Sequence, residues 1–79
     1  MLACSDLREM IEALTTSIVV HEREEALFNR SACASVGEEA RQILFQISEE
    51  MHRHIEFLLG KKRELIDQLN LQLANKKQE

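Results

Sequence analysis

Histidine and glutamate side chains at helical spacing are the residues of this chain that could carry chemistry. His21 and Glu25 stand four positions apart, so on one face of a helix the carboxylate can reach the imidazole. Such a pair could bind a metal ion or transfer a proton. It could also be a buried polar pair that fixes the register of two packed helices, and we prefer this structural interpretation.

A second group of titratable residues occupies positions 49–54, with the sequence EEMHRH. Glu49 and His52 have the Glu-x-x-His spacing that di-iron helical bundles use for two inward-facing ligands. At 100° per residue, however, Glu49 points away from the apolar stripe of its helix and His52 lies off the edge of that stripe. His54 lies at the margin of the stripe, but Met51, three residues earlier, is not a hard iron ligand. We therefore expect a solvated charged face here.

Other chemistry finds little support. Neither Cys4 nor Cys33 has a catalytic base at helical spacing, and the chain has no glycine-rich phosphate loop or zinc-type ligand spacing. Fourteen acidic and ten basic side chains give a net charge of −4, which disfavours binding to nucleic acid or to an anionic membrane. Two helices also offer no cavity that excludes water from a substrate, so we expect a protein that is not an enzyme.

Composition and periodicity predict an all-α protein. The 79 residues contain no proline, tryptophan or tyrosine and only two glycines, and good helix formers are abundant. We expect one domain over 1–79, with a first helix over 5–31 capped by Ser5, a turn over 32–36, and a second helix over 37–76. Ser35 and Glu38 have the spacing of a capping box at the start of the second helix. Because the turn is short, the helices should form an antiparallel hairpin.

Each helix carries an apolar stripe at spacings of three and four residues. In the first helix the stripe is Leu7, Met10, Ile11, Leu14, Ile18, His21, Glu25, Phe28 and Ala32. In the second it is Ala40, Leu44, Ile47, Met51, Ile55, Leu58, Lys62, Ile66, Leu69 and Leu73. Folding the chain about residues 34–35 predicts three level pairs: Ile18 with Met51, Leu14 with Ile55, and Ile11 with Leu58.

Cysteine usage and hydropathy favour a soluble, cytoplasmic protein. Cys4 and Cys33 would be on the order of 40 Å apart along one helix, too far for an intrachain disulfide, so we expect free thiols and a reducing compartment. No stretch approaches the roughly 18 apolar residues of a membrane span, and Asp6, Arg8 and Glu9 interrupt the amino-terminal region where a signal peptide would be apolar.

A chain this short buries too little surface to be stable without help, so we expect a protein partner. The hairpin should either form a homodimeric four-helix bundle or bind another helical protein. We predict that the partner-binding residues are Leu14, Ile18, Met51, Ile55, Leu58, Ile66, Leu69 and Leu73. Leu69, Leu71 and Leu73 should extend past the first helix, uncovered by the chain. Further apolar residues lie off the stripes, namely Val19, Val20, Ala26, Leu27, Phe45 and Phe57, and such patches are typical of binding surfaces.

Residues 21–54 resemble the helical hairpin of rubrerythrins and encapsulated ferritins. With His54 aligned to the ligand histidine of that family, Phe28 falls at its usual aromatic position and Ala32 at its usual small residue, without gaps. The two ligand glutamates of the family fall on His21 and Met51, so the resemblance implies the fold and departs at the ligands. As the alternative function we consider a dimer of hairpins that binds iron or zinc through His21, Glu25, Glu50 and His54.

Residues 55–69 resemble the last helices of the small flagellar and type III secretion export chaperones. The similarity rests on the pattern Ile55-x-x-Leu58-Leu59-x-x-x-Arg63-Glu64-Leu65-Ile66-x-x-Leu69. Members of those families are short, acidic, helical and cytoplasmic, and they hold an amphipathic segment of a secreted partner. The resemblance implies a non-enzymatic adaptor or export chaperone without a cofactor, which agrees with the exposed apolar residues.

Overall fold

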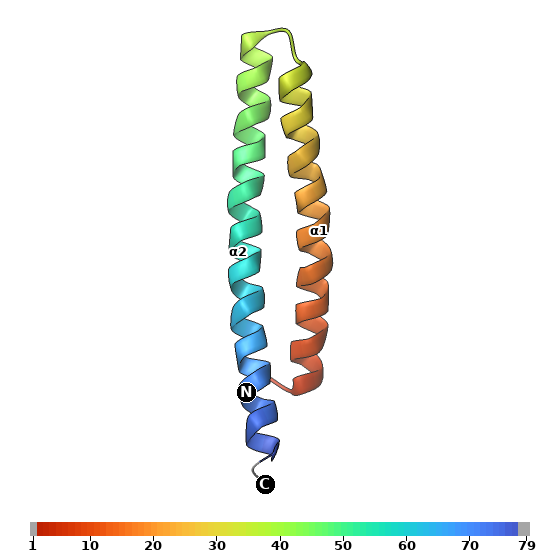
Figure 1. Cartoon of the computed structure of the whole chain (residues 1–79), viewed down its shortest axis with the longest axis vertical. Helices are drawn as coiled ribbons and strands as arrows, with labels where there is room; N and C mark the ends of the chain where they lie inside the picture. Colours follow the sequence, from red (N-terminus) through yellow and green to blue (C-terminus); the bar gives the residue numbers. More distant parts are fainter. Residues whose placement is uncertain (1, 78–79) are drawn as a thin grey trace.

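The computed structural model describes residues 2–77, and side chains through Asn75. It consists of two helices, α1 (Cys4–Ala34) and α2 (Glu38–Lys77), packed side by side as an antiparallel hairpin (Figure 1). The predicted all-α hairpin is therefore confirmed. In the described part of the chain, neither helix is both long enough and apolar enough to cross a membrane.

The first helix begins one residue earlier than predicted, and Ser5 is not its cap. The N-cap is Ala3, in an extended conformation without a side-chain cap, and its carbonyl accepts the Leu7 N–H at 3.0 Å. The Gln72 side chain explains this start, because it donates to the Leu2 carbonyl at 2.7 Å and accepts from the Cys4 thiol at 3.1 Å. The two bonds tie the residue before the N-cap and the first residue of α1 to α2.

The predicted capping box in the turn is also wrong. The Ser35 hydroxyl donates to the Ser31 carbonyl at 2.8 Å, so Ser35 terminates α1 and does not start α2. Gly37 precedes α2 directly, and its carbonyl accepts the Arg41 N–H at 3.0 Å. Glycine is tolerated at an N-cap position, and the backbone carbonyl there makes the first bond of the helix without help from a side chain.

The register of the two helices differs from the prediction. Three side-chain pairs define it: Asn29 with Ser48, Glu25 with His52, and Cys4 with Gln72. These pairs place Ile18 at the level of Leu58 instead of Met51, a shift of roughly two helical turns. By the same shift, the predicted pairs of Leu14 and Ile11 are wrong. The cause is visible in Figure 1: the start of α2 lies farther along the hairpin than the end of α1, and the linker spans this offset. The first turn of α2 therefore extends beyond α1.

The new register also corrects the predicted overhang at the other end. Leu69 lies at the level of Leu7, and Leu69 and Leu73 are both half-buried, whereas Leu71 is 64% exposed. Among the three leucines, only Leu71 behaves as an uncovered side chain. The end of α2 nevertheless extends past the first turn of α1 (Figure 1).

The hydrophobic core is a single line of side chains between the helices. Among the described residues, the buried apolar side chains are Leu7, Ile18, Ala32, Ile55 and Leu65. The molecule is 64 Å long and 15 Å wide, with a radius of gyration of 17.9 Å, compared with about 12 Å for a compact chain of this length. Its accessible surface is 5993 Å², whereas a compact monomer of 9.2 kDa exposes roughly 4,900 Å². The excess of about 1,000 Å² is surface that a compact fold would bury.

Candidate functional site

The predicted pairing of His21 with Glu25 does not form. His21 Nδ1 lies 2.7 Å from the Ser17 carbonyl and 3.3 Å from the Ser17 hydroxyl, one turn earlier on α1. The Glu25 carboxylate instead lies 3.1 Å from Nδ1 of His52 on α2. Both residues of the predicted pair thus have nearer partners, one on the backbone and one across the helix contact.

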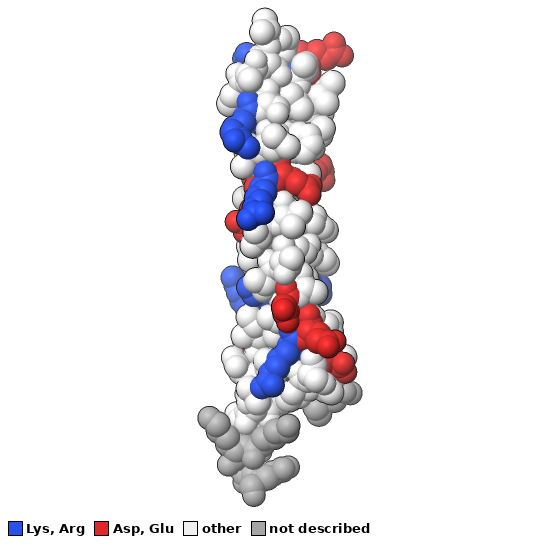
Figure 2. Space-filling view, turned by 90° about the vertical axis from the view of Figure 1, so that its right-hand side faces the viewer, with Lys and Arg blue, Asp and Glu red and all other residues white. Residues whose placement is uncertain are grey.

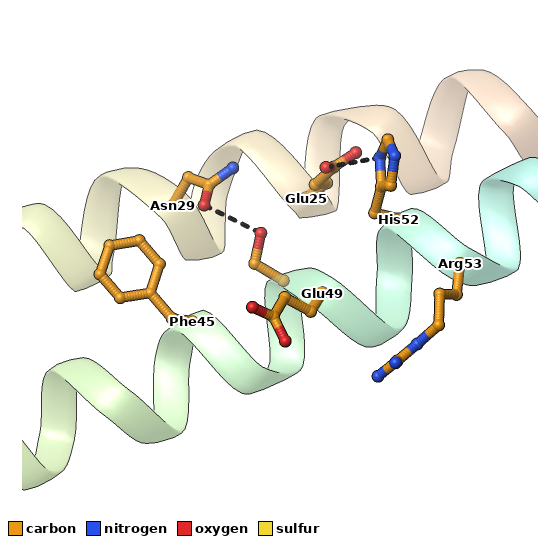
Figure 3. Close-up of a pocket in the computed structure, with 7 residues that line it drawn as sticks. Glu25, Asn29, Phe45, Glu49, His52 and Arg53 are labelled. Atoms are coloured by element: carbon orange, nitrogen blue, oxygen red, sulfur yellow. Dashed lines mark hydrogen bonds and ion pairs between the residues drawn. The ribbon is translucent and has the colours of Figure 1, made fainter.

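One side of the helix contact is polar, and we call it the polar side. Most of the residues that line its shallow groove of about 520 Å³ are polar or charged (Figure 3): Glu25, Asn29, Ser48, Glu49, His52 and Arg53, with the Phe45 ring beside them. The hydroxyl of Ser48, which is only 4% exposed, donates to Asn29 Oδ1 at 2.9 Å. This bond satisfies a buried polar side chain and fixes the two helices at one relative position.

His52 lies in the more exposed part of the polar side. Its Nδ1 faces Glu25, and its Nε2 lies 3.3 Å from the Glu56 carboxylate. The imidazole is 57% exposed and Glu49 is also exposed, so the expectation that the Glu49 and His52 pair faces solvent is confirmed. The cross-helix contact between His52 and Glu25 was not predicted, because the predicted register placed these residues at different levels.

The other side of the helix contact is apolar, and we call it the apolar side. Two grooves of about 480 and 440 Å³ follow one another along it. The groove nearer the chain ends includes Met10 and Leu14 with Lys61, and the groove nearer the turn includes Ile43, Ile47 and Met51. Met10 and Ile43 are 41% and 50% exposed, so apolar side chains remain in contact with water here.

Two histidines of the apolar side, His21 and His54, meet in the groove nearer the turn. The ring centroids of His21 and His54 are 4.8 Å apart in an edge-to-face arrangement, and the Phe57 ring stacks on His54 at 6.4 Å. The Lys61 ammonium lies 5.7 Å from the centroid of Phe57. If Nδ1 of His21 donates to the Ser17 carbonyl, Nε2 carries the lone pair and can accept a ligand.

The proposed metal ligands do not converge within one chain. His21, Glu50 and His54 line the same groove, but Glu25 belongs to the polar side, and Glu24 takes its place in that groove. Glu50 is paired with Arg53. Within residues 2–75, whose side chains are described, no group of three or more histidine, cysteine or acidic side chains is arranged to hold a metal ion. The geometry therefore contradicts the prediction that Glu25 is a metal ligand together with His21, Glu50 and His54.

The predicted partner-binding residues divide into three groups. Ile18 and Ile55 are each 5% exposed and pack between α1 and α2, so the closed hairpin does not present them, and their assignment to its surface is wrong. Leu14 and Met51 line the grooves of the apolar side. The remaining four are half-buried: Leu58, Ile66, Leu69 and Leu73.

Sequence reasoning missed the exposed residues that edge the apolar side. Ile43 was not assigned to any surface, and Met10 was placed in the core stripe. Phe57, which is 58% exposed, was recognised as lying off the stripe. A stripe assigned from spacing alone cannot locate its own edge, because the edge depends on how far the partner helix reaches around.

The outer face of α1 also carries uncharged surface. No charged residue occurs between Glu12 and Glu22, and Val20 and Leu27 on this helix are 45% and 51% exposed. Figure 2 shows the α1 side of the molecule, with charged side chains gathered into groups and uncharged surface between them. Val20 and Leu27 line neither groove of the apolar side.

Cys4 and Cys33 lie near opposite ends of α1, and both thiols are free.

Comparison of the chain with protein-family models, with curated proteins and with solved structures gives no match. The candidate function therefore depends on the geometry of the two sides.

Proposed function

We propose that this protein is a non-enzymatic helical hairpin that binds another helical protein surface through its apolar side, as an adaptor or export chaperone. The observation that carries the proposal is the surface excess of about 1,000 Å² over a compact monomer of the same mass. A partner that covered much of this excess surface would complete the hydrophobic core, which two helices alone leave open to water.

The apolar side is the best candidate for the covered surface. Its grooves are lined by Met10, Leu14, Ile43, Ile47 and Met51, and complete burial of one such side chain contributes about 1.5–3 kcal/mol. The polar side offers less, because its carboxylate, amide and hydroxyl groups already bond one another across the helix contact. An amphipathic helix placed in the grooves would form a third layer on the hairpin.

The test is co-purification from cells that express the protein, with a double variant of the apolar side, Met10→Glu with Ile43→Glu. Both residues are at least 41% exposed, so the hairpin itself should fold. We expect the variant to lose its bound partner, since each new carboxylate would have to give up its contact with water when the partner covers the groove. Helix content from circular dichroism should stay unchanged.

A matched control places the same substitutions on the outer face of α1, Val20→Glu with Leu27→Glu. These positions have similar exposure, 45% and 51%, and line neither groove. The control should retain the partner. Loss in the control together with retention in the apolar-side variant would reject the apolar side as the binding surface.

A second candidate function is metal binding by His21 and His54, favoured by the contact between their rings. Iron or zinc would need further ligands, for which Glu24 and Glu50 of the same groove, or residues of a second hairpin, are available. The test is zinc and iron content after dialysis of purified protein, with His54→Gln compared with His52→Gln on the polar side. Metal that is lost only in His54→Gln supports this function, and metal-free wild-type protein after incubation with either ion rejects it.

A further inference from the structure

We infer that the occupant of the apolar side is a second copy of this chain, running antiparallel to the first, with the two-fold axis near His54 and Phe57. The inference rests on the proposed function and names its partner. It follows from the area of the apolar side and from the distribution of charge along it.

The area is sufficient for a stable dimer. The whole molecule measures 64 Å by 15 Å, so a complete face of it offers a flat footprint of roughly 960 Å², whereas a standard interface buries about 800 Å² on each partner. The two grooves lie along this length and leave a row of half-exposed apolar side chains. Two hairpins packed by this side form a four-helix bundle.

The charges distinguish the two symmetric arrangements. The groove nearer the turn carries two carboxylates, Glu24 and Glu50, whereas the groove nearer the chain ends carries Lys61 and Glu64, which are paired at 3.3 Å. A parallel dimer would bring four carboxylates together, two from each copy. An antiparallel dimer instead places each pair of carboxylates opposite the neutral groove that holds Lys61 and Glu64, so the two acidic grooves stay apart in a two-fold interface.

The axis follows from the positions of these charges on α2. Glu50 and Lys61 are eleven residues apart, about 16 Å along the helix, and their midpoint lies beside His54 and Phe57. Rotation about this point places Lys61 of one copy at the level of Glu50 of the other. It also places Met10 of one copy at about the level of Ile43 of the other, so the groove nearer the chain ends of one copy lies over the groove nearer the turn of the other.

The first measurement is the mass of the pure protein by light scattering, from about 1 to 100 µM. We expect a dimer that dissociates on dilution. Lys61→Glu should weaken association by about fivefold or more at low salt, and Glu50→Lys should do the same. The double variant with both substitutions should regain much of the lost affinity, because the opposite charges again face each other; a parallel dimer would show no such recovery.

Cross-linking locates the interface. In a background with Cys4→Ser and Cys33→Ser, protein carrying Met10→Cys is mixed with protein carrying Ile43→Cys and treated with a short bis-maleimide reagent. The mixed product should form, whereas Met10→Cys alone should give little dimer. Leu27→Cys, on the outer face of α1, is the control and should remain monomeric on the gel.

The outcomes separate this inference from the proposed function. If the pure protein stays monomeric at 100 µM, the inference that a second copy occupies the apolar side is overturned. The proposed function then survives if the wild-type protein binds a different partner in cells and the apolar-side variant loses it. A dimer that cross-links through Met10 to Met10 overturns the antiparallel arrangement. A dimer that cross-links through Leu27 overturns the apolar side as the interface in both proposals.

Discussion

The polar side and the apolar side of the hairpin differ in what their residues have already bonded. On the polar side, Asn29 is bonded to Ser48 and Glu25 to His52, so the polar groups are satisfied within the chain. On the apolar side, the grooves expose side chains that only another surface can cover. The comparison indicates that the two sides have different roles: the polar side sets the register of the helices, and the apolar side is available to bind a partner.

The core between the two sides gives the largest expected effect. Ile55 is 5% exposed and packs where both sides meet, so Ile55→Ala should cost about 2–4 kcal/mol of unfolding free energy through lost burial and the cavity left behind. The measurement is urea denaturation followed by circular dichroism. Phe57→Ala, two residues along and 58% exposed, is the control and should change the unfolding of the isolated hairpin much less.

An equal loss in the two variants would contradict this picture, because Phe57 would then be as well packed as Ile55. If the protein is dimeric under the conditions used, the comparison is made at a concentration where light scattering shows monomer. The control thus separates packing inside the hairpin from packing against a partner.

The fold was predictable because it depends on local patterns that require no knowledge of distant contacts. The 3–4 spacing of apolar residues and the absence of proline predicted two helices, and both exist. The helix ends were misplaced by a few residues. The amide of Gln72, which is 68 residues from Cys4 in sequence, ties down the amino terminus, and no local pattern reveals such a bond.

The candidate site was less predictable because it depends on the register. The offset between the end of α1 and the start of α2 shifts the residues that lie opposite each other by roughly two helical turns. The spacing of residues along one helix contains no information about this shift. His21 and His54 were both identified, and their ring contact follows from the true register. Glu25 was assigned to His21 for the same reason, since the predicted register placed its actual partner, His52, at a different level.

The buried hydrogen bond of the polar side gives an intermediate effect. Ser48→Ala removes the hydroxyl that donates to Asn29, and Asn29→Ala removes the acceptor. Each change should cost about 1 kcal/mol, and a double-mutant cycle from urea denaturation should show a coupling of about 0.5–1.5 kcal/mol. Additive effects would mean that the two side chains do not bond in solution, and the polar side would lose its role in setting the register.

The exposed pair of the polar side gives the smallest effect. His52 is 57% exposed and Glu25 is 24% exposed, so water screens the contact between them, and a double-mutant cycle of Glu25→Gln and His52→Gln should give a coupling of about 0.2–1 kcal/mol. When His52 is protonated, the coupling should shrink as salt is added, because the Debye length falls from about 10 Å at 0.1 M to about 3 Å at 1 M and approaches the distance between the two groups. A coupling independent of salt would indicate a neutral hydrogen bond, and the polar side would then be held by hydrogen bonding alone.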